Sequence, residues 1–219
     1  MNTQSTLRQR VCNLALLALS IPMLAGCFGA AVVGVGAGAL MITDRRNSET
    51  YIADESMEVR ASNRINEKYG DKVHVNTTSY NRMVLLSGEV PSAEIKADVE
   101  KIVSGVPNVK SISNELAIAG PSSFGGRSND SYLTSKVKAR FVDANKFSPN
   151  HVKVVTEAGV TFLLGLVTQA EANAAVEITR TTGGVQKVVR VFEIISPEQA
   201  KAIDNKPEPA PEPKTPAKK

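Results

Sequence analysis

The sequence predicts an α+β protein built from two tandem copies of one small domain. The chain repeats itself: the segment 54–61 parallels 130–137 at an offset of 76 residues, and 84–90 parallels 161–167 at an offset of 77. Both copies also show the same order of periodicities, which reads helix-strand-strand-helix-strand. A period this long indicates a duplicated domain rather than a solenoid of short repeats. We expect each copy to pack two helices on a small three-stranded sheet.

The first helix of each copy follows from apolar residues at positions i, i+4 and i+8. Such spacing places the apolar side chains on one face, which then covers the sheet. The residues that form this stripe are Met57, Ala61 and Ile65 in the first copy and Leu133, Val137 and Phe141 in the second.

Two strands follow the first helix in each copy. Alternating residues at 73–77 and 152–154 predict a half-buried strand. The more apolar segments Met83–Val90 and Val160–Val167 predict the second strand. The residues between them, Asn81-Arg82 and Ala158-Gly159, suit a tight hairpin turn.

A second helix and a last strand complete each copy. The helices are expected at 93–104 and 170–181, and Thr168 with Glu171 has the spacing of a capping box. In the last strand of the second copy, the core-facing set and the outward set are both apolar. The core set is Val188, Phe192 and Ile194, and the outward set is Val189, Val191 and Ile195. We therefore expect the outward set to contact the first copy or a protein partner.

The N-terminus has the features of a secretory signal. Arg8 and Arg10 precede an apolar run from Val11 to Leu24, which is shorter than the roughly 20 residues that span a bilayer. The run ends in Leu24-Ala25-Gly26-Cys27, which resembles the lipobox of bacterial lipoproteins. The resemblance implies cleavage after residue 26 and acylation of Cys27, for instance with palmitate. The alternative is an ordinary signal peptide with a chance cysteine.

The remaining segments connect the domains. We expect a signal peptide at 1–26, a lipidated cysteine and flexible tether at 27–52, domains at 53–119 and 130–196, and a linker at 120–129. Residues 197–219 are rich in Pro and Lys, and such a composition predicts a disordered tail.

Composition and motifs argue against catalysis. The formal charge of +4 includes Arg8 and Arg10, which leaves too little positive charge to indicate nucleic-acid binding. Of the two cysteines, Cys12 lies in the signal and Cys27 at its end, so the mature chain has no pair for a disulfide. His74 and His151 coincide under the repeat but lack a neighbouring nucleophile or carboxylate pair. The sequence therefore indicates no catalytic set, no metal site and no cofactor.

The second strand of each copy carries a family resemblance. It runs into Gly88-Glu-Val90 and Gly165-Leu-Val167 before a helix, and this pattern resembles the BON domain. Two such domains behind a lipobox resemble the dual BON-domain outer-membrane lipoproteins. The resemblance implies a periplasm-facing outer-membrane lipoprotein that is not an enzyme and binds anionic phospholipid. It also implies a role in envelope integrity and in cell division, at division sites.

The outward face of the first helix differs between the copies. In the second copy it carries aromatic, small and apolar residues bordered by lysines, a combination that suits an interfacial lipid contact. These residues are Tyr132, Ser135, Ala139 and Val142 with Lys136 and Lys138; the first copy has Ser56, Val59, Asn63 and Asn66. The resemblance implies anionic phospholipid as the ligand, and we expect phosphatidylglycerol or cardiolipin. The alternatives are that the strip packs on the other domain, or that the protein is an adaptor for the outer-membrane protein assembly machinery.

Overall fold

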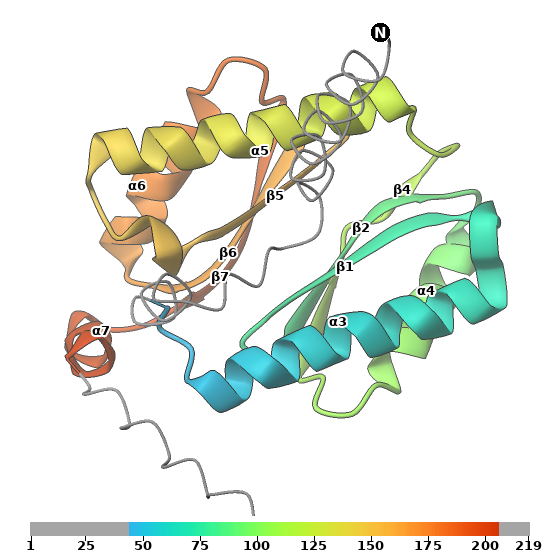
Figure 1. The fold of residues 1–219 in the computed structure, drawn as a ribbon, viewed down its shortest axis with the longest axis horizontal. Helices are drawn as coiled ribbons and strands as arrows, with labels where there is room; N and C mark the ends of the chain where they lie inside the picture. Colours follow the sequence, from blue (N-terminus) through green and yellow to red (C-terminus); the bar gives the residue numbers. More distant parts are fainter. Residues whose placement is uncertain (1–43, 206–219) are drawn as a thin grey trace, which may run out of the picture. The chain divides into compact units, whose positions relative to one another are not determined.

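The computed structural model describes residues 44–205. The first repeat contains two long helices and four strands (Figure 1). In chain order the elements are α3 (Ser48–Tyr69), the 3-10 turn η2 (Gly70–Lys72), β1 (His74–Tyr80), β2 (Met83–Val90), α4 (Ala93–Ser104), β3 (Ser111–Asn114) and β4 (Ala117–Ile118).

The second repeat has the same order and is followed by a short helix. Its elements are α5 (Phe124–Ala144), η3 (Pro149–His151), β5 (Lys153–Glu157), β6 (Val160–Val167), α6 (Gln169–Arg180), β7 (Lys187–Ile194) and then α7 (Pro197–Asp204). The predicted helix-strand-strand-helix-strand order is confirmed in both copies.

Both sheets share one topology. The second strand of each repeat is central, with an antiparallel neighbour on one side and a parallel neighbour on the other. The parallel neighbour is reached through the second helix, so this helix covers one face of the sheet. In the first sheet the last strand is split into β3 and β4, which both pair with β2. That sheet therefore has four strands by count, where three were expected.

The hairpin turns require positive φ angles at both central residues. Asn81 and Arg82 have φ of 52° and 66°, and Ala158 and Gly159 have φ of 48° and 76°, as in type I′ turns. Three of the four are not glycine, so the turns need support. Asp54 accepts hydrogen bonds from both amides of the first turn, at 2.7 and 2.8 Å. The duplicated Asp130 does the same in the second, at 2.9 Å each.

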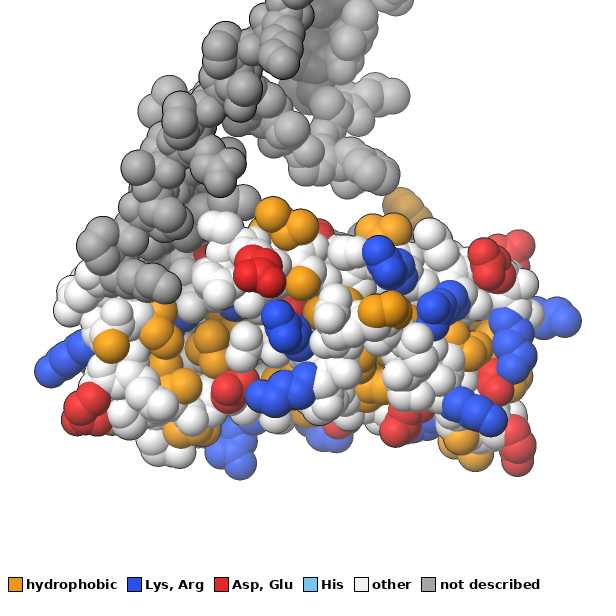
Figure 2. Space-filling model, turned by 90° about the horizontal axis from the view of Figure 1, so that it is seen from below, with side chains coloured by type: hydrophobic (Ala, Val, Ile, Leu, Met, Phe, Trp, Pro, Cys, Tyr) orange, Lys and Arg blue, Asp and Glu red, His pale blue; other side chains and the backbone are white. Residues whose placement is uncertain are grey.

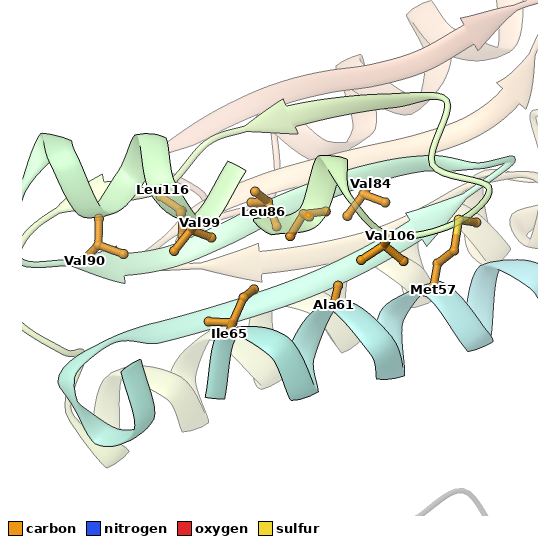
Figure 3. Packing of buried hydrophobic residues seen from close by; sticks show 10 residues of the cluster. Met57, Ala61, Ile65, Val84, Leu86, Val90, Val99, Val106 and Leu116 are labelled. Carbon is orange, nitrogen blue, oxygen red and sulfur yellow. The ribbon is translucent and has the colours of Figure 1, made fainter. Parts of the chain in front are cut away.

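Side chains divide between a charged exterior and aliphatic cores. Viewed from the side on which α3 lies, the surface mixes Lys and Arg with Asp and Glu among separate hydrophobic side chains (Figure 2). Beneath it, Met57, Ala61 and Ile65 of α3 point toward β2 and α4 (Figure 3). In the second repeat Val137 and Phe141 of α5 pack in the equivalent core. Both predicted apolar stripes are therefore the core faces of their helices.

A third apolar cluster joins the two repeats, and all described residues belong to one compact unit. Tyr80 and Leu85 of the first sheet pack with side chains of the second, which are Phe162, Leu164, Leu166, Val189, Val191 and Ile195. The outward valines of β7 therefore contact the first repeat. This was one of the two contacts expected from the sequence, the other being a protein partner. Val191 is only 6% exposed, so the first repeat covers most of its surface, whereas Val189 is half-buried. Ile194, expected in the core, is half exposed at the strand end.

The element boundaries differ from those expected in three places, each for a local reason. Helix α3 begins at Ser48, inside the expected tether, because the Asn47 side chain caps its first turn. Helix α5 begins at Phe124, inside the expected linker, because Ser123 caps it. The expected disordered tail begins with α7, for which Ser196 and Gln199 form a capping box. The expected signal peptide and Cys27 lie outside the described residues.

Candidate functional site

Helix α5 buries one face and exposes the other. Leu133, Val137 and Phe141 are at most 2% exposed. On the opposite side Tyr132 and Val142 are each 62% exposed, and Ser135, Lys138 and Ala139 are exposed too. The predicted strip therefore packs on neither the other domain nor the linker within residues 44–205.

The start of α5 adds an aromatic residue that the sequence reading missed. Phe124 is 81% exposed, the largest exposure among the large hydrophobic side chains of the described residues. At 100° per residue, Phe124, Tyr132, Ser135, Ala139 and Val142 fall within an arc of about 80°, and the first and last are about 27 Å apart along the axis. We call these five residues the outward face of α5. Phe124 was overlooked because residues 120–129 read as a linker, although Ser123 before it is a helix cap.

The serines of this region are less polar than their type suggests. The Ser135 hydroxyl donates to the carbonyl of Ser131 at 3.0 Å, and the Ser131 hydroxyl donates to that of Arg127 at 3.1 Å. Hydroxyls that bond back to the preceding turn do not have to be desolvated separately when the face leaves water. The outward face of α5 can therefore enter an apolar boundary at a lower cost.

The two flanking lysines have different environments. Lys136 is half-buried and donates from Nζ to the carbonyl of Gly183 at 2.9 Å. Its Nζ also lies 5.9 Å from the centroid of the Tyr132 ring, at the limit of a cation–π contact. Lys138 is exposed. Two further exposed cations, Arg127 and Lys146, lie at either end of the helix.

Helix α3 provides an internal comparison. It also exposes two apolar residues, Ile52 at 65% and Val59 at 59%, so its outer face is less polar than the sequence reading suggested. However, Glu49, Glu55 and Glu67 lie within about 60° of Ile52 on the helical wheel. An acidic border repels anionic groups. The border of α5 carries Lys136 and Lys138 and one exposed acid, Asp143 near its C-terminal end, so its balance of charge attracts them. The two faces therefore differ in charge more than in apolar content.

Neither helix is suited to crossing a bilayer. Within residues 44–205, every helix is too short or too polar to be a membrane span.

The duplicated histidines have carboxylate neighbours that the sequence did not reveal. His74 Nδ1 lies 2.7 Å from Glu89 and 3.7 Å from Glu157. His151 lies 3.5 Å from Glu171 and 3.8 Å from Asp204. Neither histidine has a carboxylate pair near it in the sequence, but each faces one in the structure. The partners are 15 to 83 residues away in sequence, and only strand pairing and domain packing bring them near.

Burial governs the protonation of these groups. Desolvation, aided by the charge of Arg45, lowers the pKa of His151. Desolvation raises the pKa of Glu157, although the hydrogen bond from Asn76 opposes the shift. The Ser122 hydroxyl lies 3.3 Å from His74 Nδ1. Because Glu89 contacts the same ring nitrogen, these side chains do not form the relay of nucleophile, base and orienting carboxylate that indicates catalysis.

Known proteins resemble this chain over half to most of its length. A family model for the BON domain matches residues 54–120 and 129–196. The outer membrane lipoprotein DolP of Haemophilus influenzae is 38% identical over 185 residues, which cover 84% of this chain and 96% of that protein. A 21 kDa hemolysin of Actinobacillus pleuropneumoniae is 30% identical over 154 residues, covering 69% of this chain and 79% of that protein. Osmotically-inducible protein Y of Escherichia coli is 34% identical over 110 residues, covering 49% and 55%.

Proposed function

Since the chain belongs to the BON-domain family and carries two copies of the domain, we propose that it is a non-enzymatic outer-membrane lipoprotein that binds anionic phospholipid through α5. Its role is then to support envelope integrity from the periplasmic face of the outer membrane, with the bound lipid selecting its position. The relative named as an outer membrane lipoprotein, similar over nearly its whole length, supports the location.

The outward face of α5 is the observation that carries this proposal. It combines an exposed ring at each of two positions, Phe124 and Tyr132, with the exposed Val142. Aromatic rings favour the headgroup level of a bilayer, and aliphatic side chains favour the acyl boundary. A helix lying in the interface plane can place all three at the same depth.

The cationic border selects the lipid class. Lys138 is free to pair with phosphate, and Lys136 is positioned beside the Tyr132 ring. Each basic residue near an anionic surface contributes about 1 kcal/mol at moderate salt. Phosphatidylglycerol and cardiolipin are therefore the proposed ligands, and binding weakens as salt increases.

A lipid anchor makes a weak site sufficient. Acyl chains on Cys27 would hold the protein at the membrane, because each buried methylene contributes about 0.8 kcal/mol. Tethering then raises the effective concentration of α5 at the bilayer surface. In this arrangement Cys27 retains the protein, while Tyr132 and the lysines determine which lipids surround it.

The test is a lipid titration of the chain without residues 1–27, followed residue by residue by NMR. All three apolar clusters lie within residues 44–205, so this truncation removes none of the described contacts. Phosphatidylglycerol micelles should shift amide signals from Phe124 to Val142 and leave α3 unchanged. Phosphocholine micelles should cause much smaller shifts.

Two variants, each with an exposed apolar residue replaced by Glu, test whether binding depends on α5. Tyr132→Glu should reduce the affinity for anionic micelles at least tenfold. Val59→Glu, at a similarly exposed position of α3, is the matched control and should leave it unchanged. If the Tyr132→Glu variant binds as tightly as the parent, α5 is not the lipid site.

A further inference from the structure

The duplicated histidines occupy equivalent positions but differ in how the nearby negative charge is balanced. In the second repeat the guanidinium of Arg45 lies between Glu171 and Asp204. It donates to Glu171 at 2.7 and 3.0 Å and to Asp204 at 2.9 Å twice. Both carboxylates beside His151 are thus paired with one cation that belongs to the chain.

The two carboxylates beside His74, one from each repeat, form no ion pair of this kind among residues 44–205. Glu89 is 4% exposed and Glu157 is 7% exposed, and both lie beside His74. Among residues 44–205, no Lys or Arg forms an ion pair with either of them. Two desolvated carboxylates that share one imidazole are costly unless a cation balances them.

We propose that His74, Glu89 and Glu157 form a binding site for a divalent transition-metal ion of the Zn²⁺ type. One ligand atom from each of the three side chains lies within 4.8 Å of the others. One imidazole with two carboxylates is a donor set that Zn²⁺ accepts, with a water completing the coordination. His74 and Glu89 belong to the first sheet and Glu157 to the second, so the ion would join the two domains.

The surrounding groups support the ligands as an outer shell does in metal sites. Asn76 Nδ2 donates to the second oxygen of Glu157 at 2.6 Å, and the amide of Ser122 donates to Glu89 at 3.1 Å. The hydrogen bond between His74 and Glu89 must open from 2.7 Å to the roughly 3.3 Å that separates donors around a tetrahedral ion. A small rotation of the Glu89 carboxylate achieves this.

An unpartnered hydroxyl lies on the same face of the first sheet. Ser87 is fully buried, and its Oγ has no hydrogen-bond partner among residues 44–205. It pairs directly across the strands with Asn76 and, two residues from Glu89, points to the same side of β2. A metal-bound water is a polar group of the kind that this hydroxyl lacks.

The site also has a path to solvent. An open cavity of about 440 Å³ lies between the first sheet and the second repeat, and His74, Asn76 and Glu157 are among its lining residues. Asp130 and Thr134 of α5 line it as well. An ion can therefore reach the ligands without unfolding either domain.

The experiment is a Zn²⁺ titration of the full chain, purified in detergent without a histidine tag and freed of metal by chelation. We expect one ion per chain by equilibrium dialysis. We also expect the melting temperature to rise by about 5 °C at a hundredfold excess over the dissociation constant. Mg²⁺ at the same concentration should produce no shift, because it prefers an all-oxygen shell.

Three variants separate this site from others. Glu157→Gln retains the shape of the side chain and should weaken Zn²⁺ binding at least tenfold, as should His74→Gln. His151→Gln changes the only other histidine, whose neighbouring carboxylates are already paired with Arg45, and should leave binding unchanged. Parent protein that binds no Zn²⁺ at about 0.1 mM would overturn the proposal. Equal binding by Glu157→Gln, or a loss of binding only in His151→Gln, would overturn it too.

Discussion

Arg45 and Glu171 lie 126 residues apart in the chain and form a two-point ion pair, with 2.7 Å from Nη1 to Oε2 and 3.0 Å from Nη2 to Oε1. The Arg45 side chain is 3% exposed, and it also binds Asp204 of α7. One guanidinium thus fastens the segment before α3 and the helix after β7 to the second domain. The first and last described segments of the chain therefore lie next to each other.

This ion pair predicts a dependence of stability on pH. Burial by itself would raise the pKa of Glu171, but the hydrogen bonds from Arg45 and Thr168 outweigh it and lower the pKa to about 2. A carboxyl whose pKa is lower in the folded state stabilises the fold above its unfolded value of about 4.3, and this contribution is lost as the pH falls toward 2. Arg45→Gln should therefore destabilise the protein at pH 7 and less so at pH 3. Melting temperatures across this range measure the difference. Arg180→Gln, which breaks an exposed pair with Glu177, should change little at either pH.

Position 88, in the central strand of the first sheet, should tolerate no side chain larger than that of glycine. Its φ is +110°, and a Cβ there would lie 2.1 Å from the carbonyl oxygen of His74. Gly88→Ala should therefore cost about 3 kcal/mol, through both the clash and the backbone strain. Gly125→Ala, in α5 with no neighbour closer than 4.0 Å, should be neutral or stabilising by up to about 1 kcal/mol. Urea unfolding of both variants would test this contrast, and equal stability would contradict it.

The raised pKa of Glu157 has a consequence for the metal-free protein. Burial is the largest cause of the shift. A carboxyl with a raised folded-state pKa opposes folding once the pH exceeds its unfolded value, because a charge must then be kept in a buried site. Glu157→Gln should raise the melting temperature at pH 7 in the presence of chelator, and this gain should disappear near pH 4. Glu193→Gln is a suitable control, because Glu193 also accepts an Asn amide across the domain boundary. A gain that is the same at both pH values would point to packing rather than charge.

Phe124 predicts that the lipid-contact region begins earlier than Tyr132. A ring that is 81% exposed in water gains free energy when part of its surface enters the acyl boundary. Phe124→Ser should weaken binding to phosphatidylglycerol micelles three- to tenfold without changing the melting temperature. Ile52→Ser on α3 removes a side chain of similar exposure and should have no effect on binding. Fluorescence or NMR titration of the two variants distinguishes these outcomes.

The apolar cluster between the repeats predicts a single unfolding transition. Leu85 is fully buried in this cluster, so Leu85→Ala should cost roughly 2–4 kcal/mol. Because both sheets share the cluster, both domains should lose stability together in a urea experiment. Two separate transitions, with only the first-domain signals shifted, would show that the domains fold independently.

Local pattern was sufficient for most of the fold. The duplication at 76 to 77 residues indicated two copies, and the periodicities located β2, β6 and α4 at the bounds that the structure has. These elements are amphipathic or continuously apolar, and each contains its own turn or cap signals. Local signals were overlooked where a segment looked like a linker, as at Ser123 and Ser196, whose side chains cap α5 and α7. A single capping residue is a weak signal when no apolar stripe follows it.

The sequence by itself determined the family, the two copies, the core faces of α3 and α5 and the unusual outward strip around Tyr132. Helix and strand periodicity and residue type are properties of short segments, and these findings depend on nothing else. Only the tertiary structure decided that Val191 is covered by the first repeat, that Arg45 binds Glu171 and Asp204, and that His74 lies beside Glu89 and Glu157. These relationships depend on strand register and on how two sheets pack. Both arise from contacts between residues far apart in the chain, and no local pattern encodes them.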